Sequence, residues 1–379
     1  MLAALLRFGR RMDWTLLIAA FVLFCFGMAA IFSVDLSRGG SDVLIQKQLI
    51  AFALGAAGLW LVAATNYHLL RNYARALYAL GIFSLVAVLI LGETLNGSTG
   101  WFVLGGFAFQ PVEFMKVALG IKLAQYFSEH ARRRFSWRDL LVTGMTTALP
   151  ILLLMLQPDL GGASILAGVW AVAVLIAGLR PGQFFALVGA VGVAAVLGWT
   201  FLFADYQKDR VMTFINPALD PLETGYNVTQ AKIAIGAGGL WGRGLGGGSQ
   251  SQLRFLPESQ TDFVFAVIAE ELGFLGVVVV LMALSVLLLR TLWIARITRD
   301  TFGAYLCVSA FAVLFVEALV HIGANLSLIP ATGVALPFVS YGGSSLLLSL
   351  IMLGLVQSVA VRLAPGDRLT LERGVYTQK

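Results

Sequence analysis

Three short stretches of the sequence place an acidic side chain at the start of a long apolar run. They are FQPVEFMKVALGIK at 109–122, QPDLGGAS at 157–164 and FLPESQTDFVFAVIAEELGFLG at 255–276. A carboxylate in such a position can cap a helix, bind a divalent cation or accept a proton from a hydroxyl group. The candidates for chemistry are therefore Glu113, Asp159 and Asp262.

The first stretch also carries a lysine inside the apolar run. Pro111 suits a first helical turn, so Glu113 is expected near the helix N-terminus, with Lys116 three residues later on the same face. An acid in the first turn complements the helix dipole. Lys116 gains nothing from that dipole, because it lies more than one turn inside the run, and it could instead meet an anionic ligand.

The other two acids have a structural alternative as helix caps. Asp159 is a natural N-cap for the apolar helix that follows it, and capping alone would account for it. Ser259-x-x-Asp262 has the form of a capping box, with Asp in place of the more usual Glu or Gln. Capping and chemistry both stay open for Asp262.

Further polar residues occur deeper in two apolar runs. Glu270 and Glu271 lie about 12 Å along the third run, and one of them could face His321. His321 is one helical turn from both Glu317 and Asn325. Such a buried polar network favours a structural role, in holding helices in register.

The composition identifies the elements that carry these side chains. Apolar residues make up 59% of the 379 residues and charged residues only 12%, which predicts an all-α, polytopic membrane bundle. A helix needs roughly 20 apolar residues to cross the hydrocarbon layer, and the hydropathy divides into about ten spans. The predicted spans lie near 14–34, 46–64, 74–92, 111–128, 140–156, 160–178, 183–203, 262–289, 302–328 and 339–362.

Basic residues orient the predicted bundle, because they gather at every second connection. This pattern predicts that both termini are cytoplasmic. The net charge of +6 is mostly a cytoplasmic collar and does not favour nucleic acid, because the basic residues form no single stripe. The collar comprises Arg7, Arg10, Arg11, Arg71, Arg75, Arg132, Arg133, Arg134, Arg138, Arg180, Arg290, Arg296, Arg299, Arg362, Arg368, Arg373 and Lys379.

A long outer segment, residues 204–261, joins the seventh and eighth predicted spans within a single membrane domain, residues 1–379. Connections of this length are usually functional or disordered. Apolar groups around Ile233 and Trp241 indicate short helices or re-entrant pieces packed on the bundle.

The predicted topology relates the three acidic stretches to one another. Spans four, six, eight and ten all run from outside to inside, so their positive N-terminal ends face outward beneath the long segment. Helix N-termini bind phosphate oxygens, and nearby carboxylates can bind a divalent cation or act as bases. This combination suits a lipid-linked pyrophosphate at the outer membrane face. The polar starts are Gln110 and Glu113, Gln157 and Asp159, Thr261 and Asp262, and Ser340-Tyr-Gly-Gly-Ser-Ser345.

Six long motifs resemble the SEDS family, the shape, elongation, division and sporulation proteins, over nearly the whole chain. Two of them, FAVIAEELG and PFVSYGGSS, are closer to its elongation branch than to its division branch. The chain departs from the family at Gly100, Val112, Gly162 and Gln260, where the family commonly has a basic residue, Ser, Thr and His, but it keeps the acids. The motifs are QPVEFMK at 110–116, QPDLGGA at 157–163, NPALDPLETGYN at 216–227, KIAIGAGGLWGRG at 232–244, FLPESQTDFVFAVIAEELG at 255–273 and LPFVSYGGSS at 336–345.

The resemblance implies a peptidoglycan glycosyltransferase of the bacterial inner membrane that polymerises lipid II during cell elongation and releases undecaprenyl pyrophosphate. It also implies a class B penicillin-binding protein and the elongation machinery as partners. Asp262 matches the family's essential acid, implied to be a general base or a ligand of a Mg or Mn ion. Glu113, Lys116 and Asp159 match positions that line the family's outer cavity, and Trp101 matches a further substrate-binding position.

Two other classes of function stay open at this point. The SEDS family also resembles candidates for a lipid II flippase, and an intramembrane Glu317/His321 pair could relay protons for such a transporter. A scaffold that only recruits the penicillin-binding protein would not need an acid in a cavity. The flippase and the scaffold therefore differ from the polymerase in what they require of Asp262.

Overall fold

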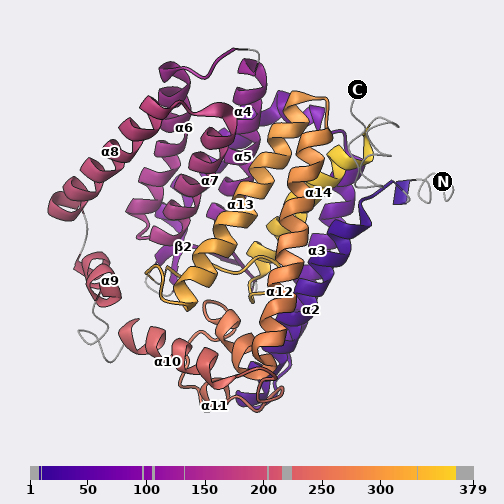
Figure 1. Ribbon diagram of the computed structural model, residues 1–379, viewed down its shortest axis with the longest axis vertical. Coiled ribbons are helices and arrows are strands. Elements are labelled where there is room, and N and C mark those ends of the chain that lie inside the picture. The colour runs from indigo at the N-terminus through magenta and orange to yellow at the C-terminus, as the bar shows by residue number, and fades with distance from the viewer. Residues whose placement is uncertain are drawn as a thin grey trace.

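A computed structural model describes residues 8–9, 11–95, 98–104, 107–131, 133–202, 205–215, 224–330 and 332–363. Several terminal basic residues of the predicted collar, and part of the 216–227 motif, lie outside these residues. Within them there are ten long helices, most of which run along the long axis of the molecule, whereas α8 slants away from that axis at one side (Figure 1). They are α2 (Trp14–Ser37), α3 (Val43–Ala64), α4 (His68–Leu91), α5 (Pro111–His130), α6 (Trp137–Leu156), α7 (Leu160–Gly178), α8 (Pro181–Leu197), α12 (Val264–Ile297), α13 (Thr301–Asn325) and α14 (Gly343–Val361).

The predicted class of an all-α membrane bundle is confirmed. Nine of the ten described helices are long and apolar enough to cross a membrane, α8 being continued by a short π-helix, η1 (Gly198–Leu202). The tenth, α5, carries charged residues but is buried over most of its length. It lies inside the bundle, in contact with α4 and α13. Other helices therefore surround Glu113 and Lys116, whereas Glu129 near the end of α5 is exposed.

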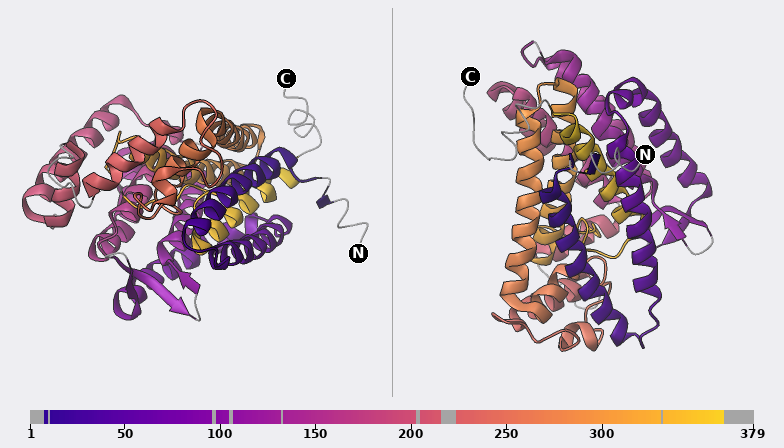
Figure 2. Two further views of the ribbon diagram at one scale, coloured as in Figure 1. Left: turned by 90° about the horizontal axis from the view of Figure 1, so that it is seen from below. Right: turned by 90° about the vertical axis from the view of Figure 1, so that its right-hand side faces the viewer.

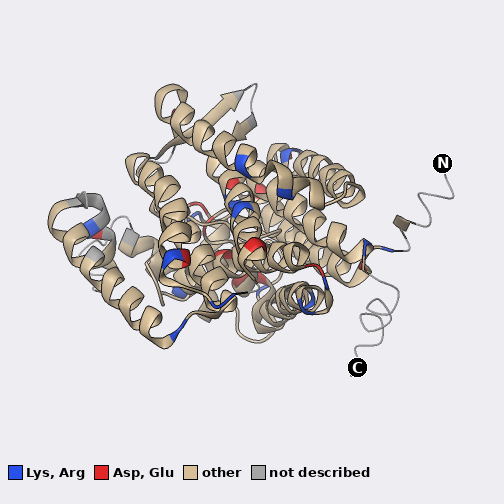
Figure 3. Cartoon of the chain, turned by 90° about the horizontal axis from the view of Figure 1, so that it is seen from above, with Lys and Arg blue, Asp and Glu red and all other residues tan. Residues whose placement is uncertain are grey.

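The centre of the bundle is formed by α13, α14 and α5. In the most apolar stretch of each helix, 83% of the residues of α14 and 72% of those of α13 are buried, whereas only 22% of those of α4 are buried. The helix α3 packs along α14, and α2 packs along α12. Seen from the end opposite to α10 and α11, several acidic residues lie toward the middle of the bundle, while basic residues are spread over many helices (Figure 3).

Shorter elements cover the end of the bundle at the bottom of Figure 1, which is called the outer end because it carries the predicted outer segment; the opposite end is called the inner end. The helices α9 (Asp205–Ile215), α10 (Thr224–Ala237) and α11 (Ser249–Gln252) belong to the long outer segment. An antiparallel sheet, β1 (Glu93–Leu95), β2 (Ser98–Leu104) and β3 (Phe107–Phe109), lies to one side of the bundle beside α4 (Figure 2). The hydropathy pattern did not indicate this sheet, because its strands are short.

The helix α12 differs from the predicted eighth span in its start and its length. It begins at Val264 and continues to Ile297, whereas the span was predicted near 262–289. Its helical backbone is interrupted at Gly273, where φ is 66°. Only glycine adopts such a conformation routinely. The helix therefore consists of two pieces that meet at Gly273.

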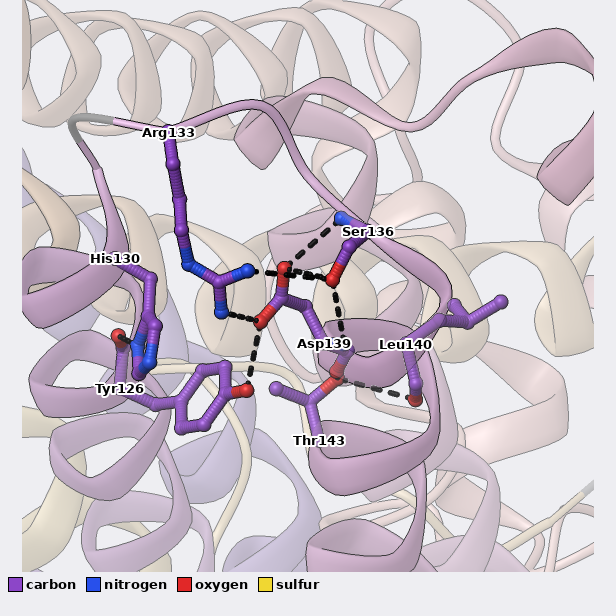
Figure 4. Close-up of polar contacts among 7 residues, drawn as sticks. All are labelled: Tyr126, His130, Arg133, Ser136, Asp139, Leu140 and Thr143. Carbon is purple, nitrogen blue, oxygen red and sulfur yellow. Dashed lines mark hydrogen bonds and ion pairs between the residues drawn. The ribbon is translucent and has the colours of Figure 1, made fainter.

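The inner turn between α5 and α6 is held by a compact polar cluster (Figure 4). Ser136 is the N-cap of α6 and forms a capping box with Asp139. The Asp139 carboxylate accepts hydrogen bonds from the Ser136 backbone N–H at 2.9 Å and from the Tyr126 hydroxyl at 2.8 Å. Arg133 forms an ion pair with it at 2.5 Å. This cluster fixes the inner end of α5 against the start of α6.

Candidate active site

The start of α5 follows the sequence prediction. Pro111 occupies the first helical position and Glu113 lies in the first turn. The Lys116 ammonium is 2.7 Å from a Glu113 carboxylate oxygen and also pairs with Glu317 of α13. Lys116 is 5% exposed, Glu113 8% and Glu317 3%. Two carboxylates therefore share one ammonium in a buried position.

The sequence did not reveal Glu317 as the partner of Lys116. The two residues are 201 positions apart, and only the packing of α13 against α5 brings them together. The available signal was an acid inside an apolar run, which marks a functional or paired residue. A narrow pocket lies beside Lys116 between α5, α13 and α14, with room for about one water molecule.

Asp159 caps α7, as predicted. Its side chain accepts a hydrogen bond of 2.7 Å from the Gly162 backbone N–H. The next residues allow close packing: a Cβ at Gly161 would lie 2.5 Å from the Thr332 carbonyl oxygen, and one at Gly162 would lie 2.9 Å from Val112. The start of α7 thus contacts both the start of α5 and the segment that follows α13.

The capping interpretation of Asp262 is wrong. The N-cap of α12 is Phe263, which has no side-chain capping bond. Asp262 belongs to the preceding turn, where its backbone N–H donates to the Glu258 carbonyl at 3.0 Å. Glu258 has a positive φ of 49°. This turn closes on Glu258, so neither Ser259 nor Asp262 occupies the capping position.

The backbone around Asp262 is held by two other parts of the fold. The Asn325 side chain, at the end of α13, donates to the Asp262 carbonyl at 2.9 Å. The Ser340 hydroxyl donates to the Thr261 carbonyl at 2.7 Å, and the Tyr341 N–H donates to the Gln260 carbonyl at 2.8 Å. Burial raises the pKa of the Tyr341 hydroxyl, so it stays protonated at neutral pH.

The α13–α14 connection, residues 326–342 and described except for residue 331, joins these helix starts. A Cβ at Gly333 would lie 3.4 Å from a side-chain oxygen of Asp262, and Thr332 adjoins Gly161. The ring Nδ1 of His321 bonds the Val334 carbonyl at 2.7 Å. The starts of α5, α7, α12 and α14 therefore adjoin one another at one end of the bundle.

Trp101 lies on a different element from these acids. It is paired with Glu93 across β1 and β2, and β2 packs against α4 and α5. The Trp101 side chain is partly buried. It therefore lies on the α4–α5 side of the outer end.

The predicted contact between Glu270 or Glu271 and His321 is wrong. Glu270 accepts hydrogen bonds from the backbone N–H groups of Gln250 and Ser251, at 2.9 and 3.2 Å. Glu271 bonds Ser33 of α2 and the Ser251 hydroxyl. The break at Gly273 turns this part of α12 toward α2 and the outer segment. These two acids therefore attach the outer segment to the bundle.

The proton relay suggested for a transporter also has a different geometry. Glu317 bonds Lys116, whereas the Nδ1 atom of His321 bonds a backbone carbonyl. The His321 Nε2 atom is buried without a hydrogen-bond partner. Each member of the suggested pair thus has its own partner on another element.

The described part of the chain contains no group of three His, Cys, Asp or Glu side chains arranged to hold a metal ion. A preformed site made of protein ligands alone is therefore not present among those residues. Mg²⁺ is commonly held by one or two carboxylates together with substrate phosphates.

Comparison with known proteins gives a consistent result over most of the chain. The profile of a family described as "Cell cycle protein" and covering FtsW, RodA and SpoVE matches residues 13–364. Stage V sporulation protein E of Bacillus subtilis is 36% identical over 360 residues, covering 92% of this chain and 96% of that protein. The peptidoglycan glycosyltransferase MrdB of Escherichia coli is 36% identical over 352 residues, covering 92% and 93%.

Solved structures have the same arrangement of helices. A structure described as showing coordination of polymerization and crosslinking by a peptidoglycan synthase complex aligns with a TM-score of 0.79 and 31% identity, over 92% of this chain and 97% of that chain. The rod shape determining protein RodA of Thermus thermophilus aligns with a TM-score of 0.68 and 30% identity, over 92% and 96%. The similarity therefore extends from the motifs to the entire bundle.

Proposed function

The chain belongs to the family of FtsW, RodA and SpoVE, also called SEDS, and from this premise we propose that it is a peptidoglycan glycosyltransferase that polymerises lipid II. Relatives that carry the name peptidoglycan glycosyltransferase match more than nine tenths of the chain. The proposed role is in cell elongation, and the similarity to RodA supports this part of the proposal.

In this reaction the 4-hydroxyl group of one sugar attacks the anomeric carbon of another. The new glycosidic bond forms as the bond to the lipid diphosphate breaks, and undecaprenyl pyrophosphate leaves with the bonding electron pair. A base must accept the proton of the attacking hydroxyl group, and positive charge must stabilise the leaving diphosphate. The site therefore needs a positioned carboxylate beside a place for phosphate.

The observation that carries this proposal is the fixed backbone of Asp262 among four adjoining helix starts. Hydrogen bonds from Asn325 and Ser340 hold the turn that carries Asp262, and Gly333 leaves space beside its carboxylate. A carboxylate held in this way can accept a proton without first being ordered. Asp262 is the proposed general base or cation ligand.

Other residues have supporting roles in this proposal. Asp159 caps α7 at the same outer end, so its carboxylate lies where the donor or acceptor would be positioned. Glu113 and Lys116 act together with Glu317, because the ammonium already has two carboxylate partners. Substrate phosphate would therefore compete with these carboxylates for Lys116. Trp101, on the outer sheet, is a proposed sugar contact.

The proposed cofactor is a divalent cation, Mg or Mn. Bound between Asp262 and the substrate diphosphate, it would neutralise charge on the leaving group. Among the described residues, we assign Asp262 as the ligand of this cation. Lys116 does not replace such a cation readily, because the two carboxylates around it outweigh its positive charge.

The proposed location is the bacterial inner membrane, with the active site outside and both termini in the cytoplasm. The basic connections are the basis for this orientation. The proposed partners are a class B penicillin-binding protein and the elongation machinery. The similarity to a chain from a peptidoglycan synthase complex that polymerises and crosslinks supports such a partner.

The test is a polymerisation assay with the purified full chain in detergent, lipid II and Mg²⁺ or Mn²⁺. We expect glycan strands from the wild type and a loss of about 10²-fold or more for Asp262→Asn. Asp42→Asn is the matched control, because Asp42 is an exposed aspartate at the outer end of α3, and it should polymerise normally. Thermal unfolding of each variant confirms that it is folded.

This assay, together with the growth of cells that carry the variant, separates the alternatives. A flippase has no two compartments to work between in detergent, so it would produce no glycan there. A scaffold would need no acid at position 262, so cells carrying Asp262→Asn would keep growing. Full glycan synthesis by folded Asp262→Asn would refute the assignment of Asp262.

A further inference from the structure

One turn of the outer segment exposes large apolar side chains instead of burying them. This interfacial turn, residues 239–246, follows α10. Within it Trp241 is 80% exposed, Leu240 is 64% exposed and Leu245 is 52% exposed. Apolar groups exposed together on one short turn indicate a surface that another apolar phase or molecule covers.

The interfacial turn is held firmly against α12, so its exposed side chains are not the result of a loose loop. The N–H groups of Arg243 and Gly244 donate to the carbonyls of Glu270 and Glu271 at 3.0 and 2.9 Å. In the other direction, the Phe274 N–H donates to the Gly239 carbonyl at 2.9 Å. These bonds attach both ends of the turn to α12.

Glycine is required where the two backbones meet. A Cβ at Gly242 would lie 2.1 Å from the Glu271 carbonyl oxygen, and a Cβ at Gly273 would lie 2.2 Å from the Gly242 nitrogen. The interfacial turn therefore packs directly onto the break in α12. Its position relative to the membrane follows from the position of that break.

Two helices place this break at the outer boundary of the hydrocarbon layer. From Phe274 to Ile297, α12 has about 24 residues and a length of about 36 Å, slightly more than the hydrocarbon core of about 30 Å. On α2, the Ser33 hydroxyl accepts from the Gly246 N–H at 3.2 Å. Ser33 is about 29 Å from Trp14 at the inner end of α2.

The surroundings continue the membrane-facing surface of the bundle. Next to the turn, Phe274 is 58% exposed on α12 and Leu36 is 49% exposed on α2. Gly246 adjoins Leu36. Arg243, also exposed, lies between Trp241 and Leu245 in the turn. Tryptophan and arginine beside apolar residues are typical of the membrane–water interface.

From these observations we propose that the interfacial turn inserts into the outer leaflet, with lipid as the molecule that covers it. Leu240, Trp241 and Leu245 contact the acyl chains near the headgroups. The Arg243 guanidinium donates to the Ala237 carbonyl at 3.2 Å and to the Ser249 hydroxyl at 3.4 Å, and its remaining N–H groups face lipid phosphate in this proposal. This anchor does not depend on the glycosyltransferase assignment. It holds one end of the segment that leads to Asp262 at the membrane surface.

The test measures the depth of single labelled cysteines in phospholipid nanodiscs that contain only this chain. The variant Trp241→Cys is made with Cys25→Ser and Cys307→Ser, which remove the two native cysteines. An environment-sensitive fluorophore is attached, and lipids carry a spin-label quencher either near the headgroup or deep in the acyl chain. We expect the shallow label to quench the fluorophore at position 241 more strongly than the deep label does.

Two reference positions calibrate the measurement. The first reference is native Cys25, exposed in the middle of α2, in a protein that carries only Cys307→Ser. A fluorophore at Cys25 should be quenched most by the deep label. Ser41→Cys, exposed in the polar connection after α2, should be quenched mainly by aqueous iodide. If Trp241→Cys does not fold, Leu245→Cys replaces it as the reporter. Shallow quenching at 241 or 245, and not at 41, supports the proposal.

Three outcomes would overturn the proposal. The first is that iodide quenches labels at residues 241 and 245 as strongly as it quenches a label at residue 41. The second is a lack of preference for the shallow over the deep lipid quencher. The third is exposure to iodide in nanodiscs that is lost only when a partner protein is added, since the patch would then bind protein and not lipid.

Discussion

The two ends of α5 carry ionic clusters that differ in construction and in the burial of their cation. At the inner end, Asp139 is paired with one arginine and forms a capping box with Ser136, three positions away. At the outer end, Lys116 is shared by Glu113 and Glu317, and the second of these comes from another helix. The inner cluster balances its charges, whereas the outer cluster has one carboxylate more than it has cations.

The difference separates an acid whose partners are complete from a cluster whose charges are not balanced. A capping box with a matched cation satisfies its acceptors locally, so it requires nothing further. A buried group with excess negative charge is costly unless a proton, a cation or a polar ligand offsets it. The outer cluster also adjoins the starts of α5 and α7, where Asp159 lies. Removal of one residue from each cluster should therefore have different consequences.

The largest effect is expected for Lys116→Met. The change leaves Glu113 and Glu317 as two buried carboxylates without their common cation. Loss of one partner from a buried ion pair costs about 3–5 kcal/mol. Denaturation of the purified protein in mixed micelles should show this loss in the free energy of unfolding, and polymerisation should be abolished.

The double variant Lys116→Met with Glu317→Gln is the control for this explanation. It removes one of the stranded charges, so it should recover part of the lost stability. A Lys116→Met protein as stable as the wild type would contradict the ionic description of the outer cluster.

An intermediate effect is expected for Asp139→Ala at the inner end. The change removes the acceptor for Ser136, Tyr126 and Arg133. Loss of a cap and of buried hydrogen bonds should reduce the free energy of unfolding by about 1–3 kcal/mol. Because the cluster lies at the opposite end of α5 from Asp262, the folded fraction should polymerise lipid II at the normal rate. A lower rate per folded molecule would show that the inner cluster does more than stabilise the turn.

The same contrast explains what the sequence could predict. Local signals were sufficient for Pro111 at the start of α5 and for Asp159 as the cap of α7, because both depend on residues within one helical turn. Composition and hydropathy also predicted the membrane bundle. The spacing that suggested a capping box at Asp262 was misleading, because the turn at Glu258 shifts the start of α12.

Long-range contacts could not be derived in the same way. The pairing of Lys116 with Glu317 depends on how α5 packs on α13. The contacts of Glu270 and Glu271 depend on the break at Gly273. The sequence did not predict this break, because a glycine in an apolar helix does not by itself indicate a positive φ. The family resemblance identified the acids, but it could not show which neighbours hold them.

A smaller effect on stability is expected for Glu317→Gln. The glutamine oxygen can still accept a hydrogen bond from Lys116, and the change removes the excess negative charge. The free energy of unfolding should therefore stay within about 1 kcal/mol of the wild type. Polymerisation should fall nonetheless if the excess charge serves the reaction. Normal polymerisation, measured with the same lipid II assay, would make the outer cluster structural like the inner one.

The smallest effect is expected for Arg133→Gln. The Arg133 side chain is 46% exposed, so water already screens its ion pair with Asp139, and Asp139 keeps its bonds to Ser136 and Tyr126. An exposed ion pair of this kind contributes about 1 kcal/mol or less to the free energy of unfolding. High salt should reduce the difference between this variant and the wild type, because it screens the same interaction. Arg133→Lys should retain part of the ion pair. A loss as large as that of Asp139→Ala, unchanged by salt, would mean that the arginine and not the capping box holds the inner end of α5.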